Sequence, residues 1–184
     1  MKRVYVFVAG QIEADLLQHI MPLELYENVQ IVKAGRKSGI ISLAGSVLAR
    51  RQVPVAVLID SDSPEPRVIE EVRSSTEELI RFGASSSPLE VIAVVPSIEA
   101  WLFAAPEAIS RALGEKVTDE LATLGKRDPK GVLQVLAART QRTWNFDEVL
   151  HQLHPLEIER IRALPEVSTL FTFLREMQKE DQAA

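Results

Sequence analysis

Apolar residues in the first half of the chain form short continuous runs that alternate with segments of helical periodicity. Four runs are expected to be strands, and they lie at residues 4–8, 29–32, 55–59 and 91–95. The segments at about 12–20, 40–48 and 65–82 carry apolar residues at the three- and four-residue spacing of amphipathic helices. Uninterrupted runs rich in Val and Ile are typical of strands buried on both faces. The pattern therefore predicts an α/β fold with an open parallel sheet of about four strands, flanked by helices.

The pattern changes at about residue 106, where strand signals stop. The remaining segments have helical periodicity and are separated by helix-ending residues, namely Gly114, Gly125, Pro129, Pro155 and Pro165. We therefore expect an α/β domain over residues 1–105 and a helical C-terminal extension over residues 106–184 that packs on it.

Acidic residues follow three of the four predicted strands. Asp60 and Asp62 come directly after the run at 55–59, Glu13 follows the first strand, and Glu99 follows the fourth. Parallel strands end at one edge of a sheet, and a strand order of 2-1-3-4 would make the first and third strands neighbours. Carboxylate oxygens suit Mg²⁺, or Mn²⁺ in its place, so the sequence indicates a divalent-metal site at this edge.

Each of these acids also has a structural interpretation. The segment from Asp60 to Pro64 is rich in turn formers and can lead into the next helix. Glu13 and Glu99 lie in first turns of predicted helices, where a negative charge favours the helix dipole. Ser97 is expected to cap the helix that carries Glu99. These alternatives remain open on the sequence alone.

The composition limits the binding partners, metal sites and locations that the chain can have. The net charge of −5 gives no global attraction to nucleic acid, so such a surface would have to be a local basic patch. The chain has no cysteine, which excludes disulfides and thiolate metal sites and fits a cytoplasmic location. No apolar run approaches the length of about 20 residues that spans a membrane.

The order of the motifs resembles that of Toprim domains, the catalytic modules of topoisomerases, bacterial primases and OLD-type nucleases. The motifs that carry the resemblance are Gly10-Gln11-Ile12-Glu13, Asp60-Ser61-Asp62, Ile98-Glu99-Ala100-Trp101-Leu102 and Asp128-Pro129-Lys130. The set is most similar to that of small stand-alone Toprim-like proteins of bacterial defence loci, which are often encoded beside an ATPase. The resemblance covers most of the chain and implies a Toprim or Rossmann-like sheet.

The resemblance implies a Mg²⁺- or Mn²⁺-dependent nuclease that hydrolyses phosphodiesters in DNA or RNA, with a role in phage defence and an ATPase as partner. The implied metal ligands are Glu13, Asp60, Asp62 and Glu99. The implied catalytic residues are Glu13, Asp60, Asp62 and Lys130. The candidate nucleic-acid contacts are Arg36, Lys37, Lys126 and Arg127.

One position departs from the family pattern. The family begins this region with Val-Glu-Gly, whereas this chain reads Val8-Ala9-Gly10. The strand-end glutamate, which in Toprim enzymes helps to bind metal or move protons, is therefore replaced by Ala9. Two expectations follow: a nuclease that is weakened or inactive with Ala9, or a non-catalytic subunit that binds an ATPase or nucleic acid. A receiver domain fits less well, because no acidic pair follows the first strand.

Overall fold

Four parallel strands form the centre of the protein. The computed structural model describes residues 4–82 and 86–183. The strands are β1 (Val4–Val8), β2 (Val29–Lys33), β3 (Val55–Asp60) and β4 (Leu89–Val94). Their order in the sheet is β2-β1-β3-β4, and every pairing is parallel. The predicted α/β class is confirmed, and the observed order makes β1 and β3 neighbours.

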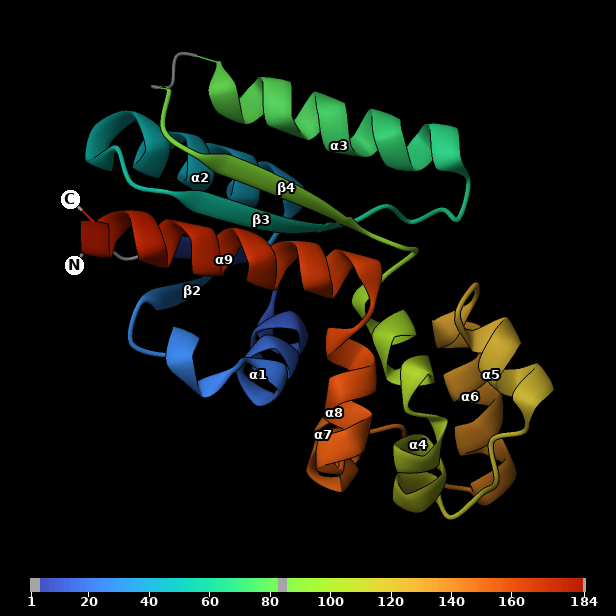
Figure 1. The fold of residues 1–184 in the computed structure, drawn as a ribbon. Coiled ribbons are helices and arrows are strands. Elements are labelled where there is room, and N and C mark those ends of the chain that lie inside the picture. The colour runs from blue at the N-terminus through green and yellow to red at the C-terminus, as the bar shows by residue number, and fades with distance from the viewer. Residues whose placement is uncertain (1–3, 83–85, 184) are drawn as a thin grey trace.

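Two helices, α2 (Lys37–Arg51) and α3 (Pro66–Arg81), cover one face of the sheet (Figure 1). Alternate strand residues such as Phe7 and Val57 pack there against Ile40 and Leu48 of α2 and Ile80 of α3. This division follows from the two-residue period of a strand, which sends successive side chains to opposite faces. The outer surface of α3, which faces solvent, carries several charged residues.

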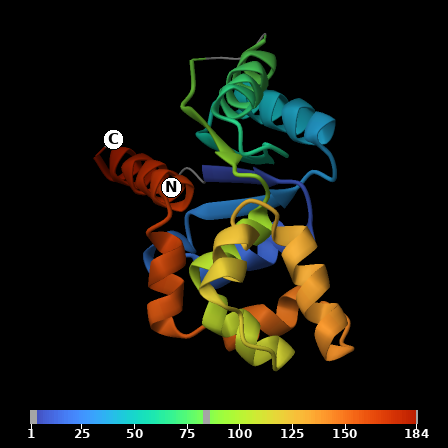
Figure 2. The ribbon, with the colours of Figure 1, turned by 90° about the vertical axis from the view of Figure 1, so that its right-hand side faces the viewer.

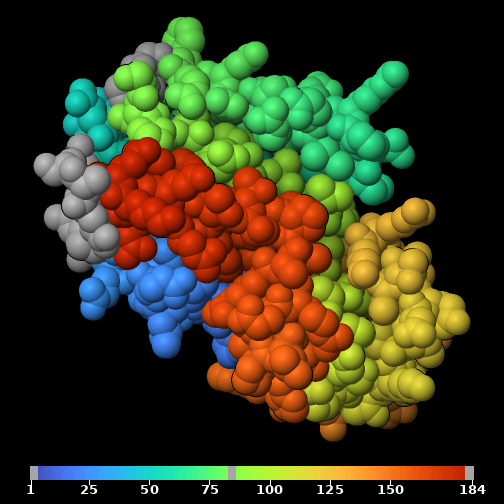
Figure 3. Space-filling view, viewed as in Figure 1, coloured from blue at the N-terminus to red at the C-terminus, as the bar shows by residue number. Residues whose placement is uncertain are grey.

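The opposite face carries helix α1 (Gln11–Ile20) and the helical second half of the chain (Figure 1). The remaining elements are η1 (Leu23–Leu25), η2 (Ile98–Ala104), α4 (Pro106–Leu113), α5 (Asp119–Gly125), α6 (Pro129–Thr140), α7 (Phe146–Gln152), α8 (Pro155–Arg162) and α9 (Pro165–Ala183). Helix α9 returns to lie along β4, and in Figure 3 it crosses the visible face between the green segment of α3 and the blue N-terminal part of the chain.

One hydrophobic core joins the sheet to the helical half. Val6 and Leu58 from the strands belong to the same buried cluster as Trp101 of η2, Leu136 of α6 and Leu170 of α9. Trp101 is only 2% exposed, so it acts as the core anchor that links the two parts. Helices α5 and α6 form a lobe on the side of the molecule seen in Figure 2. Within residues 4–82 and 86–183, no helix is both long and apolar enough to cross a membrane.

Candidate active site

The fold brings the four acidic residues of the motifs to one edge of the sheet. Asp60 is the last residue of β3, and Asp62 follows two residues later. Glu13 lies in the first turn of α1, directly after β1, and Glu99 lies in the first turn of η2, directly after β4. Because β1, β3 and β4 are neighbours and all run in one direction, their carboxyl ends converge.

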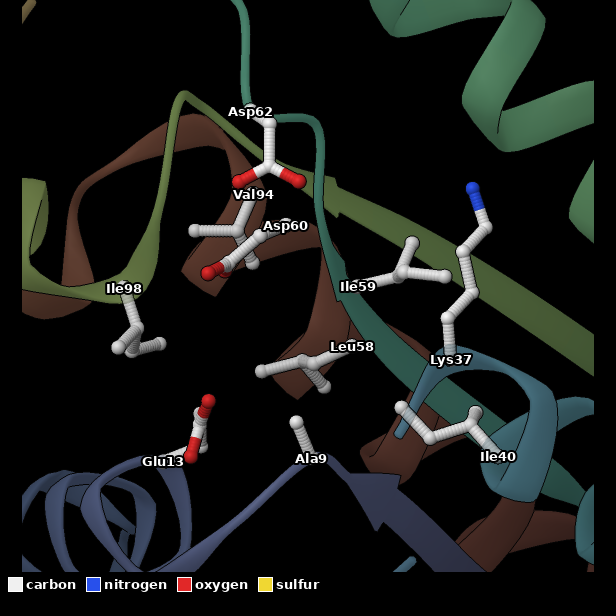
Figure 4. A pocket seen from close by; sticks show the side chains of 10 residues that line it. All are labelled: Ala9, Glu13, Lys37, Ile40, Leu58, Ile59, Asp60, Asp62, Val94 and Ile98. Carbon is white, nitrogen blue, oxygen red and sulfur yellow. The ribbon is translucent and has the colours of Figure 1, made fainter. Parts of the chain in front are cut away.

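A pocket of about 180 Å³ opens at this edge. Its acidic lining consists of Glu13, Asp60 and Asp62, and its walls are the apolar residues Ala9, Ile40, Leu58, Ile59, Val94 and Ile98, with Lys37 at the rim. Figure 4 shows the carboxyl groups of the three acids directed toward the same part of the pocket, next to Ile98. The pocket therefore combines apolar walls with a concentrated negative charge.

Asp60 is the most perturbed acid of the site. Its pKa is raised from 3.8 to about 7, chiefly because the carboxyl group is withdrawn from water. The negative charges of Glu99, Glu13 and Asp62 raise this pKa further, and the positive charge of Lys130 opposes them. Burial and like charges both favour the neutral form of a carboxyl group, so a cation at this place would restore its ionised form.

Within the described part of the chain, the Asp60 carboxyl group has no hydrogen-bond or ion-pair partner. Asp62 is held differently, through its backbone. The amide of Ser61 donates to the carbonyl of Val94 (2.9 Å), and the amide of Asp62 donates to the carbonyl of Pro96 (2.9 Å). Asp62 has a φ of 53°, in the left-handed region that Asp tolerates better than most residues. These bonds fix the turn that aims the Asp62 side chain back at the pocket (Figure 4).

Glu13 serves two purposes. One carboxyl oxygen, Oε2, accepts a hydrogen bond from the Gly10 amide at 3.0 Å, which completes a capping box at the start of α1. The same side chain points into the pocket toward Asp60 (Figure 4). The structural and the functional interpretations of Glu13 are thus compatible, but only one of its oxygens is free of the helix cap.

Glu99 is fixed from two directions. The Ser97 hydroxyl donates to Glu99 Oε2 at 2.6 Å, and Lys130 Nζ lies 3.8 Å from Glu99 Oε1. The Glu99 side chain is 12% exposed and that of Lys130 is 61% exposed. Lys130 comes from the first turn of α6, where Asp128 caps the helix by accepting from the Gly131 amide at 3.0 Å. The Asp-Pro-Lys segment thereby brings a cation to the acidic edge.

The other basic candidates lie around this edge. Lys37 lines the pocket, but its ammonium group points away from the three acids (Figure 4). Arg36 precedes α2 and is exposed, as are Lys126 and Arg127 between α5 and α6. Among the residues that the structure describes, none of Arg36, Lys126 and Arg127 forms an ion pair with the four acids. Lys130 is thus the predicted basic residue that the fold brings against them.

The acids do not form a ready-made metal cage. In the described ranges, no three His, Asp or Glu side chains are gathered so that they could hold a metal ion by themselves. The donor set nevertheless fits Mg²⁺ or Mn²⁺, because Asp60 offers hard oxygen ligands that no described residue engages and further carboxylates lie near it. Mg²⁺ commonly uses one or two direct carboxylates and several waters, so complete enclosure by protein is not required.

Ala9 occupies the lip of β1. Its carbonyl accepts from the Gly35 amide at 2.8 Å, which fixes the backbone beside the loop that leads to α2. Its methyl group lines the pocket between Glu13 and Ile40 (Figure 4). A longer acidic side chain at this position would enter the pocket that Asp60 lines.

Ser97 is the residue of the site whose contact the sequence did not predict. It occupies the N-cap position of η2, as expected, but its side chain makes no capping hydrogen bond and contacts Glu99 instead. A Ser two residues before a motif glutamate was the available signal. The spacing alone does not distinguish a hydroxyl that caps the backbone from one that donates to the carboxylate.

Comparison with known proteins supports the fold and leaves the chemistry open. No family model and no curated protein sequence matches the chain. Among solved structures, it is similar to the C-terminal region of the OLD protein of Xanthomonas campestris pv. campestris. One structure of that region, phased with mercury, is 15% identical over 98% of both chains, with a TM-score of 0.51. Another, phased with platinum, is 16% identical over 99% of this chain and 97% of the other, with a TM-score of 0.49. At this identity the first likeness shows only that the chain has a fold like that of this OLD region.

Proposed function

We propose that this protein is a divalent-metal-dependent nuclease of the Toprim type, with its site at the carboxyl edge of the sheet. The observation that carries this proposal is Asp60, a carboxyl group that has no bonded partner among the described residues and whose pKa is raised to about 7 by burial and by three neighbouring acids. Natural proteins rarely keep such an arrangement for stability alone, because it disfavours folding when the acids are ionised. Mg²⁺ or Mn²⁺ would compensate the charge.

The roles of the residues follow from their places. Asp60 and Asp62 would hold the ion, with Glu13 and Glu99 oriented around it directly or through water. The bound ion would polarise a phosphate and supply an activated water. Lys130 stands 3.8 Å from Glu99 and would offset negative charge on the phosphate during hydrolysis. The apolar walls of the pocket strengthen each of these electrostatic interactions.

Nucleic acid is the proposed substrate, either DNA or RNA. The protein carries a net charge of −5, so binding would depend on local contacts with phosphates. The exposed residues Arg36 and Lys37 stand at the start of α2, and Lys126 and Arg127 stand before α6. We propose that these four side chains guide the backbone of the substrate to Asp60.

A second candidate function rests on Ala9. Because a methyl group lines the pocket where the family has a glutamate, the protein can be a non-catalytic subunit that binds nucleic acid or an ATPase. The proposed ATPase partner, the role in phage defence and the cytoplasmic location rest on the family resemblance. Co-purification of this protein with the ATPase encoded nearest to it would test the partner.

The test of catalysis is a substitution at Ala9. We expect Ala9→Glu to raise Mg²⁺- or Mn²⁺-dependent cleavage of DNA or RNA by about 10²–10⁴-fold, the usual contribution of one positioned acid or base. Plasmid, linear duplex, single-stranded DNA and RNA are the substrates to compare, each with and without the ATPase. Ala9→Gln is the matched control, because it has the same length without the charge.

The double variant Ala9→Glu/Asp60→Asn should lose the gained activity, which would place the cleavage at this site. Equal cleavage by the unsubstituted protein and Ala9→Glu would refute the role given to Ala9. Absence of cleavage in both, with the ATPase present and with divalent-ion binding intact, would favour the non-catalytic subunit.

A further inference from the structure

Ser97 is a buried polar residue beside the proposed site, with 4% of its surface exposed. It lies between β4 and η2, on the connection whose Pro96 carbonyl accepts from the Asp62 amide. Its hydroxyl would ordinarily accept from the first turn of the helix that it precedes. No such bond forms, and the hydroxyl donates to Glu99 Oε2 at 2.6 Å.

This contact gives the two carboxylate oxygens of Glu99 different partners. Oε2 is held by Ser97, and Oε1 remains directed toward Lys130, whose Nζ lies 3.8 Å away. Lys130 is 61% exposed and its Nζ is 3.8 Å from the carboxylate, and such an exposed ion pair is too weak to hold Glu99 in one orientation by itself. The buried hydroxyl is the rigid partner in this group, because it sits on backbone that is bonded to the neighbouring strand end.

We propose that Ser97 is a positioning residue, which orients Glu99 so that one carboxylate oxygen faces Lys130 and the group as a whole faces Asp60. This inference deepens the proposed function and rests on it for the consequence at the metal. Without the hydroxyl, Glu99 would rotate toward solvent with Lys130, and both the charge around Asp60 and the position of the lysine would change.

A simpler account is that the Ser97 hydroxyl only satisfies its own need for a hydrogen bond within the protein. The two accounts differ in what happens to Glu99 and Lys130. If Ser97 positions Glu99, its removal changes the proximity of Glu99 to Lys130. If it does not, Ser97→Ala lowers stability and leaves that proximity unchanged.

The first measurement needs no metal. A water-soluble carbodiimide converts a carboxylate and an adjacent amine into an amide, and mass spectrometry of the digested protein would report the link between Glu99 and Lys130. We expect Ser97→Ala to lower the yield of this link by about threefold or more, because the reaction depends on proximity. Ser97→Thr, which keeps the hydroxyl, should restore most of the yield.

Ser110→Ala is the matched control. Ser110 is half-buried, and its hydroxyl donates to the Pro106 carbonyl at 2.9 Å and accepts from the Val117 amide at 3.0 Å, but it lies in α4. This variant should lose stability without changing the link. If Ser97→Ala does not fold, Ser97→Cys, which is similar in size and a much weaker donor, takes its place.

The second measurement is calorimetric Mn²⁺ binding. We expect Ser97→Ala to weaken binding by about tenfold, as is usual when a residue that orients a metal ligand is lost, and Ser97→Thr to recover it. An unchanged yield of the Glu99–Lys130 link in Ser97→Ala would overturn the inference. A link that depends on Ser97 in a protein without Asp60-dependent Mn²⁺ binding would support the positioning role and refute the proposed metal-dependent function.

Discussion

Asp60 and Glu157 are two carboxylates withdrawn from solvent, and the fold gives them opposite surroundings. Glu157, in α8, is 4% exposed and is fully engaged. It accepts from the Arg111 guanidinium and, at 2.7 Å, from the His154 amide, and Arg160 lies 3.9 Å away. Asp60, at the end of β3, has acids as neighbours and no bonded partner among the described residues.

The difference separates a structural acid from a candidate functional one. A buried charge is expensive to fold unless it is paired and hydrogen-bonded, and Glu157 meets both conditions. Among the residues that the structure describes, none gives Asp60 an ion pair or a hydrogen bond. A site that leaves a carboxylate uncompensated is suited to an external cation, which is why we place the chemistry at the sheet edge and assign Glu157 to the cohesion of the helical half.

The largest expected effect is on stability, and it tests the structural role assigned to Glu157. We expect Glu157→Ala to lower the free energy of unfolding by about 3–5 kcal/mol, because it leaves Arg111 without its carboxylate partner and removes the cap of α8. Urea unfolding at pH 7 would measure the change. Glu159→Ala, an exposed neighbour on the same helix, is the control and should cost less than about 1 kcal/mol. A similar small loss for both would mean that Glu157 is not the stabilising acid described here.

Asp60→Asn should raise the free energy of unfolding, in contrast to Glu157→Ala. A carboxyl group whose pKa rises from 3.8 to about 7 on folding stabilises the folded state below pH 4 and loses this contribution as the pH rises toward 7. Removal of the charge should therefore stabilise the metal-free protein at pH 8 by about 2–4 kcal/mol, since each tenfold change in proton affinity corresponds to about 1.4 kcal/mol.

The stabilisation should shrink as the pH is lowered through 7 and be absent near pH 4. Urea unfolding with a chelator at pH 4, 6 and 8 would follow it. Destabilisation by Asp60→Asn at pH 8 would show that Asp60 has a compensating partner after all, and the contrast with Glu157 would fail.

The smallest expected effect concerns the metal. At ten times its dissociation constant, Mn²⁺ should stabilise the unsubstituted protein by about 1.4 kcal/mol, the value that mass action gives for one site. Asp60→Asn should abolish this gain, whereas Glu148→Gln, an exposed acid on α7, should retain it. Thermal unfolding with and without Mn²⁺ is the measurement. Equal stabilisation of all three proteins would place the ion elsewhere.

Much of the framework was determined by the sequence alone. The strands and their parallel arrangement follow from apolar runs that alternate with helical periods, whereas the order of the strands does not. The presence of Glu13, Asp60, Asp62 and Glu99 at one edge follows from that topology, because parallel strands end on the same side. These features depend on local periodicity, which a sequence carries directly.

The tertiary structure decided which charges meet. Arg111 pairs with Glu157 across 46 positions of the chain, and no spacing rule predicts that contact. Lys130 reaches Glu99 because α6 packs near η2, and Ser97 turns from its expected capping role to that carboxylate. The difference between Asp60 and Glu157 has the same origin. Both are acidic residues, and only the packing of distant segments determines whether a basic side chain forms an ion pair with each of them.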